Sequence, residues 1–76
     1  MAYGNIGNAV QALGRYDEAI EYHKKKLEIS QQTGDISGEG AAYNNMGICL
    51  KNLGKVQEAI EMYKKTLEIS QQIGEY

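Results

Sequence analysis

The sequence contains no proline, no tryptophan and no phenylalanine, and it has a single cysteine. One cysteine cannot form an internal disulfide, and it cannot supply the thiolate cluster that a structural zinc site needs. No apolar run approaches the ~18 residues of a membrane span, and the first residues lack the charged and apolar regions of a signal peptide. We therefore expect a cytoplasmic chain with no metal, no cofactor and no membrane partner.

Charge and functional side chains exclude two further classes of function. Eight basic and ten acidic side chains give a net charge of −2, without the basic excess that binds phosphates, so we expect no nucleic-acid partner. The single histidine, His23, has Ala19 and Leu27 at the i−4 and i+4 positions, so it has no second ligand or partner at helical spacing. Without a convergent set of acid and base side chains, we do not expect an enzyme.

The sequence consists of two similar copies of one repeating unit. Aligning each residue with the residue 40 positions later, over residues 2–35 and 42–75, gives 19 identities in 34 pairs. A fixed period of this length in a short chain is typical of a repeat array, in which each unit buries its apolar face against its neighbour. We therefore expect a quasi-linear fold and not a closed globule.

Apolar spacing within each unit has the period of a helix. The first stripe is Tyr3, Ile6, Gly7, Val10 and Leu13, which Tyr43, Met46, Gly47, Leu50 and Leu53 repeat. The second stripe is Tyr16, Ala19, Ile20, His23, Leu27 and Ser30, which Val56, Ala59, Ile60, Tyr63, Leu67 and Ser70 repeat. Steps of three and four residues place each stripe on one face of a helix. The pattern predicts two helices per unit.

The residues between the stripes are typical of helix ends. Gly14 and Gly54 stand where left-handed backbone ends a helix, and Gly34 and Gly74 mark the end of the second helix of each unit. Asp35 is placed to cap the helix that follows. The sequence therefore predicts an all-α chain. Residues 1–35 form a first unit with helices of about 2–13 and 16–33, and residues 36–76 form a second with helices of about 36–53 and 56–73.

These motifs resemble the tetratricopeptide repeat. The first copy runs from Tyr3 to Val10 and continues from Leu13 to Ile20, and the second runs from Tyr43 to Gly47 and continues from Leu53 to Glu61. The 40-residue spacing and the joint at residues 34–40 look like the longer subtype found in G-protein-signalling modulators of the Partner of Inscuteable type. The resemblance implies two tandem helix-turn-helix repeats, a fragment of a right-handed α-solenoid.

Three positions depart from the pattern of that family. The small residue late in the second helix is Lys26 or Thr66, and the aromatic residue before it is His23 in the first copy, so we expect looser packing there. The acidic residue between the two helices is replaced by Arg15 and Lys55, which removes the obvious capping side chain.

Members of the family bind extended peptides or partner helices on a concave surface formed by the first helix of each repeat. Matching this chain to those positions gives Asn5, Asn8, Gln11 and Ala12 in the first copy, and Ala41, Asn44, Asn45, Ile48, Lys51 and Asn52 in the second. A carboxamide donates and accepts hydrogen bonds at once, so it suits the backbone of an extended peptide. The alternative is that each asparagine bonds within its own helix or to water.

The remaining polar and cysteine residues favour structural roles. Two short lysine runs, Lys24 to Lys26 and Lys64 to Lys65, have glutamates four residues before or after them. Such i,i+4 pairs of opposite charge are typical of a solvated helix face. Cys49 replaces Ala9 in the alignment, and we expect it to be a small packed residue.

Two functions remain in competition. The first is a protein-interaction scaffold that binds a protein or peptide. The alternative is a self-assembling unit that forms a homo-oligomer through its end faces or by a domain swap at the Gly34–Asp35 joint, because both ends of a two-repeat stack expose faces suited to another repeat. We expect those end faces to contain Tyr3, Ile6 and Val10 at one end and Tyr63, Leu67, Ile69 and Ile73 at the other.

Overall fold

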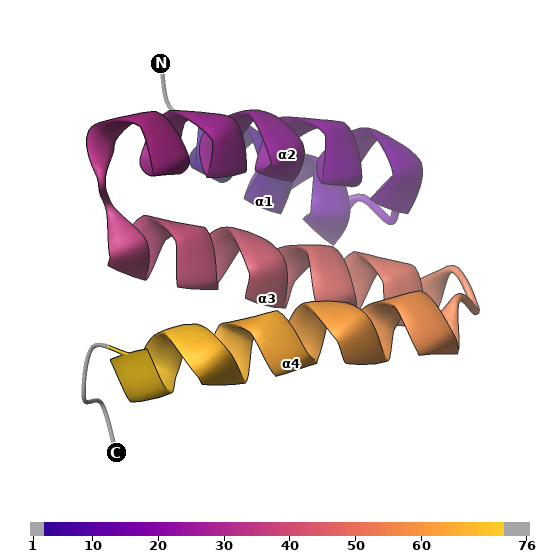
Figure 1. The fold of residues 1–76 in the computed structure, drawn as a ribbon. Coiled ribbons are helices and arrows are strands. Elements are labelled where there is room, and N and C mark those ends of the chain that lie inside the picture. The colour runs from indigo at the N-terminus through magenta and orange to yellow at the C-terminus, as the bar shows by residue number, and fades with distance from the viewer. Residues whose placement is uncertain (1–2, 73–76) are drawn as a thin grey trace.

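The computed structural model describes residues 3–72 and folds them into four α-helices (Figure 1). The helices are α1 (Tyr3–Ala12), α2 (Tyr16–Thr33), α3 (Ile36–Asn52) and α4 (Val56–Gln72). Residues 3–72 contain no strand, and the predicted all-α fold class is confirmed. Within that same range no helix is both long enough and apolar enough to cross a membrane.

The helices pack in chain order. α1 packs on α2, α2 on α3 and α3 on α4, while α1 and α3 touch only slightly. Figure 1 shows α1 behind α2, with α3 and α4 following below. The result is a slab with extents of 32 × 30 × 17 Å. A slab of this kind leaves broad faces and two end helices open to solvent.

The turn between α2 and α3 follows directly from its sequence. Gly34 has a φ of 73°, in the left-handed region that favours glycine, and its N–H donates to the carbonyl oxygen of Ser30. Asp35 then begins α3, since its Oδ1 accepts the N–H of Gly38 at 3.0 Å. The predicted cap is confirmed. By contrast, Arg15 precedes α2 and makes no capping hydrogen bond with its side chain.

In each helical hairpin, a glycine of the first helix lies against an aromatic ring of the second. Gly7 of α1 lies against the ring of His23 on α2, and Gly47 of α3 lies against the ring of Tyr63 on α4. At either glycine, an added Cβ would stand 2.8 Å from the nearest ring carbon, closer than such atoms approach in proteins. The missing side chains therefore set how closely the two helices of a hairpin approach.

The buried apolar side chains gather around α3. They are Ala19, Ala42, Met46, Cys49, Leu50 and Ala59. Four of the six belong to α3, which α2 covers on one side and α4 on another. The prediction that Cys49 is a packed residue is confirmed, since its side chain is fully buried.

The charged faces of α2 and α4 form ion pairs at a spacing different from the predicted one. The sequence predicts i,i+4 pairs, whereas the structure contains the i,i+3 pairs Glu21–Lys24 and Glu61–Lys64, each at 3.7 Å. Residues three and four apart are both neighbours on a helix surface, so a small rotamer change selects between them. All four side chains are exposed, and such pairs add little to stability.

Candidate protein-binding site

The predicted carboxamide face lies along α1 and α3. Asn5, Asn8 and Asn44 are exposed, while Asn45 is half-buried. On α3, residues 44, 48 and 51 lie about half a turn around the helix from the buried residues 46 and 50, at ~100° per residue. Asn44, Ile48 and Lys51 therefore lie on the side of α3 opposite Met46 and Leu50.

Two of the predicted residues make hydrogen bonds within the chain. Gln11 Oε1 accepts the Nε2–H of His23 at 3.1 Å, which links α1 to α2. Asn52 Nδ2 donates to the carbonyl oxygen of Ile48 at 2.8 Å, so it bonds within its own helix. For Asn52, the alternative of a bond within its own helix describes the structure, whereas Gln11 bonds to the neighbouring helix.

Two hollows beside the carboxamide face occupy equivalent places in the two hairpins. The first, about 270 Å³, includes Asn5, and the second, about 240 Å³, includes Asn44. Equivalent positions of the 40-residue repeat line the two hollows, namely Gly4, Lys26, Ile29 and Ser30 in the first and Asn44, Thr66, Ile69 and Ser70 in the second. Each hollow lies between the start of a first helix and the end of the second helix.

His23 and Cys49 are packing residues. Burial lowers the pKa of His23, and the positive charge of Lys26 lowers it further. Burial raises the pKa of the Cys49 thiol, which keeps it protonated and unreactive. Among residues 3–72, no three histidine, cysteine or carboxylate side chains gather in a way that could hold a metal ion.

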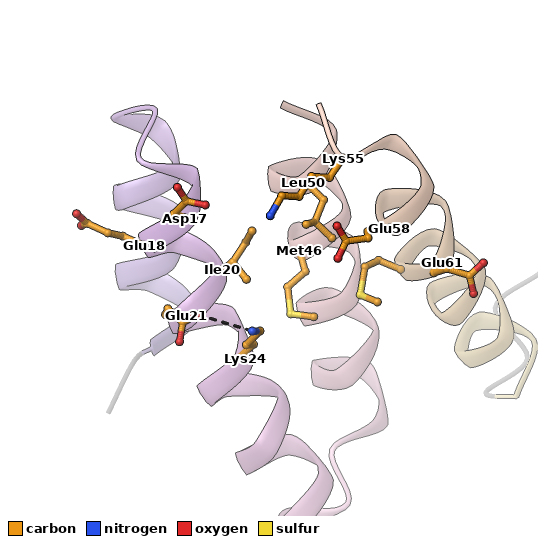
Figure 2. Close-up of a pocket in the computed structure, with 11 residues that line it drawn as sticks. Asp17, Glu18, Ile20, Glu21, Lys24, Met46, Leu50, Lys55, Glu58 and Glu61 are labelled. Carbon is orange, nitrogen blue, oxygen red and sulfur yellow. Dashed lines mark ion pairs between the residues drawn. The ribbon is translucent and has the colours of Figure 1, made fainter. Parts of the chain in front are cut away.

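A larger cavity than these two hollows lies between α2, α3 and α4. It is a groove of about 700 Å³ to which three helices and one turn contribute. α2 contributes one side, α3 the middle and α4 the other side, as Figure 2 shows. Its lining residues are Asp17, Glu18, Ile20, Glu21, Lys24, Met46, Leu50, Lys55, Glu58, Glu61 and Met62. We call it the acidic groove.

The acidic groove has an apolar floor and a charged rim. Ile20, Met46, Leu50 and Met62 form the floor. In Figure 2, Ile20 and Met46 point into the space between α2 and α3, whereas Glu18 and Glu61 project outward on opposite sides. A dashed line in the same figure marks the pair between Glu21 and Lys24.

The sequence contains a signal for this groove in the repeated positions of its glutamates, which lie outside the apolar stripes. Glu18 and Glu58 occupy equivalent positions 40 residues apart, as do Glu21 and Glu61, and all four line the groove. Taken one helix at a time, the acidic residues in the first turn of α2 and α4 are explained by the helix dipole alone. Only the packing of α2 and α4 on two sides of α3 places these glutamates around one groove.

The predicted end faces are placed in part. Ile6 and Leu67 are exposed, and Val10 is half-buried. Tyr63 instead lies against Gly47, and Ile69 packs within 3.3 Å of the Cβ position of Gly40, so both face α3 within their own hairpin.

Of the other two predicted end-face residues, the structure describes only Tyr3, which is half-buried. Tyr3 stacks on Tyr22, with ring centres 6.4 Å apart. Ile73 lies outside the described residues.

Three further apolar residues, one in the turn after α1 and two on α4, are more exposed than most of the predicted ones. Leu13 of the first turn is 69% exposed, Val56 53% and Ile60 40%. The repeat explains why. Tyr16 and Ile20, the equivalents of Val56 and Ile60, are half-buried on α2, which packs against α3. Val56, Ile60 and Leu67 together form what we call the α4 stripe. It is equivalent to the surface of α2 that packs against α3, but no helix of the described residues packs on it.

The other end shows the converse. Ile6 is 37% exposed, whereas its equivalent Met46 on α3 is 6% exposed. Ala9 is exposed, whereas its equivalent Cys49 is fully buried. The outer face of α1 (Ile6, Ala9, Val10 and Leu13) therefore matches the face of α3 that α2 covers.

Comparison with known proteins agrees with this helical architecture. A family model described as tetratricopeptide repeat matches residues 1–74. No curated protein matches the sequence. Repeats of the matched family generally mediate contacts between proteins and are typically non-catalytic. Since the match spans nearly the whole sequence, the chain belongs to the tetratricopeptide repeat family.

Proposed function

We propose that this chain is a scaffold module that binds an extended peptide or a partner helix along the carboxamide face of α1 and α3. The observation that carries the proposal is the pair of equivalent hollows, one lined by Asn5 and the other by Asn44. Two hollows related by the repeat suit a ligand that presents side chains at intervals, as an extended peptide does.

The chemistry of the face supports this proposal. Asn5, Asn8 and Asn44 are exposed, and asparagine is a mediocre helix former, so these residues contribute little to the helices themselves. Their carboxamides are able to donate to and accept from a peptide backbone. Ile48 and Lys51 add one apolar and one basic contact on the same side of α3.

The experiment begins with peptides selected from a displayed random library for binding to the wild-type chain. Their affinities are then measured by fluorescence anisotropy for Asn5→Ala, Asn44→Ala and Asn45→Ala. Each loses hydrogen bonds of ~0.5–1.5 kcal/mol, so we expect roughly two- to tenfold weaker binding with the melting temperature nearly unchanged. Gln31→Ala, at an exposed carboxamide on α2, is the matched control. Unchanged affinity in all three asparagine variants, or failure to select any peptide, would contradict the proposal.

We also propose that residues 1–35 and 36–76 are two repeats of the long subtype that resembles the G-protein-signalling modulators. The support is the 40-residue period together with the two helical hairpins, in which α2, α3 and α4 have 18, 17 and 17 residues. Hydrogen exchange tests this division, since within each pair, α1 with α2 and α3 with α4, the helices should share a common protection.

Self-association is the second candidate function, and one observation favours it. The α4 stripe is open, although its equivalent on α2 packs against α3. A second copy could place the outer face of α1 on this stripe and reproduce the contact that α2 makes with α3. Such a head-to-tail contact is heterologous and extends or closes into a ring.

Light scattering over a hundredfold range of concentration tests self-association. We expect the average mass of the wild-type chain to rise with concentration, and Ile60→Lys to remain a monomer because a charge is buried only at high cost. Gln72→Lys adds the same charge at an exposed position on α4 outside the stripe and should behave as the wild type. A monomer throughout, or equal effects of both substitutions, would contradict this candidate.

A further inference from the structure

We propose that the acidic groove is a second protein-binding surface, which takes a basic amphipathic helix of a partner protein. The groove is separate from the carboxamide face. Met46 and Leu50 line it, whereas Asn44, Ile48 and Lys51 lie about half a turn away on α3. A partner in the groove would therefore leave the carboxamide face free.

The shape and floor of the groove suit the apolar side of a helix. Its volume of about 700 Å³ lies within the range of ~300–1,000 Å³ that is typical of ligand-binding clefts. Two of the four floor residues are methionines, whose unbranched side chains adapt to irregular apolar partners. They are also two of the three methionines in the sequence. Apolar residues on one side of a partner helix would meet Ile20, Met46, Leu50 and Met62.

The negative charge of the rim favours a positively charged partner. Five of the ten acidic side chains of the chain line the groove, against two of its eight basic ones. The groove thus carries a formal charge of −3, whereas the rest of the chain carries +1. Glu21 and Glu61 are each already paired with a lysine of the same helix, but Asp17, Glu18 and Glu58 form no ion pair with any residue of the described range. Lysine and arginine flanking an apolar stripe would complement these carboxylates.

Rim and floor are brought together by packing and not by one helix. Equivalent glutamates of α2 and α4, Glu18 with Glu58 and Glu21 with Glu61, lie on the two sides of α3. A helix seated on α3 between α2 and α4 would meet carboxylates on both flanks. This arrangement fits a helix with basic residues on both sides of its apolar stripe.

The test uses a synthetic amphipathic helix of leucine and lysine, about 14 residues and ~21 Å long. Binding is measured by fluorescence anisotropy at low and at physiological salt, and located by NMR of the methionine and isoleucine methyl groups. We expect the resonances of Met46, Met62 and Ile20 to shift with added peptide, and that of Ile48 on the far side of α3 to stay unchanged. The affinity should fall as salt increases, because the rim charges are exposed.

Neutral substitutions on the rim make the test specific. We expect Glu18→Gln with Glu58→Gln to weaken binding of the leucine–lysine helix about tenfold. The matched control is Glu28→Gln with Glu68→Gln, which removes two exposed carboxylates from the same two helices, also 40 residues apart, outside the groove. Binding to the control should stay within about twofold of the wild type. Circular dichroism of both variants checks that the helices are retained.

Four outcomes would overturn the proposal. The leucine–lysine helix fails to bind, or a leucine–glutamate helix binds equally well. The groove and control variants lose the same affinity, or the shifts appear at Ile48 or Ile60 in place of the two methionines. The last outcome would place the peptide on the carboxamide face or on the α4 stripe.

Discussion

At the scale of single residues, the contacts between helices are set by pairs in which one side chain fills the space that another leaves. Lys26 occupies a position where the family prefers a small residue, and its Cδ stands 2.8 Å from where a Cβ of Gly4 would be. In the second copy the sizes are exchanged, with Asn44 in place of Gly4 and Thr66 in place of Lys26. The expected loosening at Lys26 is thus offset by a glycine on the facing helix. The sequence contains both residues, but only the packing of α1 on α2 shows that they are partners.

The glycine facing Tyr63 gives a prediction about stability. Gly47→Ala would place a methyl group 2.8 Å from a ring carbon of Tyr63, which the hairpin holds in place. Overpacking of this kind costs ~1–3 kcal/mol, and we expect the free energy of unfolding to fall by that amount in urea titrations.

Gly4→Ala is the matched control for this prediction. Its new methyl group meets only the flexible stem of Lys26, and alanine is the better helix former by ~0.5–1 kcal/mol. We expect a neutral or slightly stabilising effect. Equal destabilisation by both substitutions would mean that contact with the ring does not set the approach of the helices.

His23 predicts a pH dependence that the second hairpin lacks. Its ring is fully buried, Nε2 donates to Gln11, and Nδ1 has no partner among the described residues. Because its pKa is lowered in the folded chain, the unfolded chain takes up the proton first as the pH falls below ~6.5. The free energy of unfolding that comes from neutral, buried His23 is therefore fully present above pH ~6.5. It falls as the pH drops from ~6.5 toward the lower pKa of the folded state.

His23→Tyr isolates this effect, because Tyr63 already occupies the equivalent position against Gly47. We expect the variant to gain stability relative to the wild type as the pH falls from about 7.5 to about 5, since tyrosine does not titrate there. Thermal melts of both proteins across that range provide the measurement. A difference that stays constant with pH would show that His23 does not take part in the linkage.

At the scale of helices, the caps decide where each begins. Asp35 caps α3 through the N–H of Gly38, whereas Arg15 leaves α2 without a side-chain cap. Asp35→Ala should lower the free energy of unfolding by ~1 kcal/mol. Arg15→Asn should raise it by ~0.5–1 kcal/mol, since the backbone angles of Arg15 (φ −90°, ψ 69°) are close to those of Asp35 (φ −82°, ψ 85°). Urea titrations measure both, and a substitution at Arg15 with no effect would argue against backbone compatibility.

Helix content was accessible from the sequence because it depends on spacing within a helix. The period of three and four residues, the glycines and Asp35 are local signals, and they account for the all-α class. The acidic groove was not accessible in this way. Glu18 and Glu58 are far apart in sequence, each has a sufficient local explanation, and Met62 lies outside the apolar stripe of its helix. Their common surface exists only because α2 and α4 flank the same helix.

At the scale of the whole molecule, the slab has two unlike ends. The α4 stripe is suited to accept a helix that resembles α3, and the outer face of α1 is suited to lie on a helix that resembles α2. Within one chain the two faces are separate, so each requires a second molecule or a further repeat. If copies associate head to tail, every contact uses one face of each kind.

Mixing two charged variants distinguishes this arrangement from a symmetric dimer. Ile60→Lys blocks the α4 stripe but leaves the outer face of α1 intact, whereas Leu13→Lys blocks the face of α1 but leaves the α4 stripe intact. In a head-to-tail assembly each variant alone is a monomer. An equimolar mixture then forms a one-to-one dimer, because a single matched pair of faces remains and neither free end can extend the chain. A symmetric dimer through α4 behaves otherwise, since Leu13→Lys alone remains dimeric and mixing adds no new species. Light scattering of each variant and of the mixture separates the two cases. Gln72→Lys measured alone is the control, since it keeps both faces and should assemble as the wild type does.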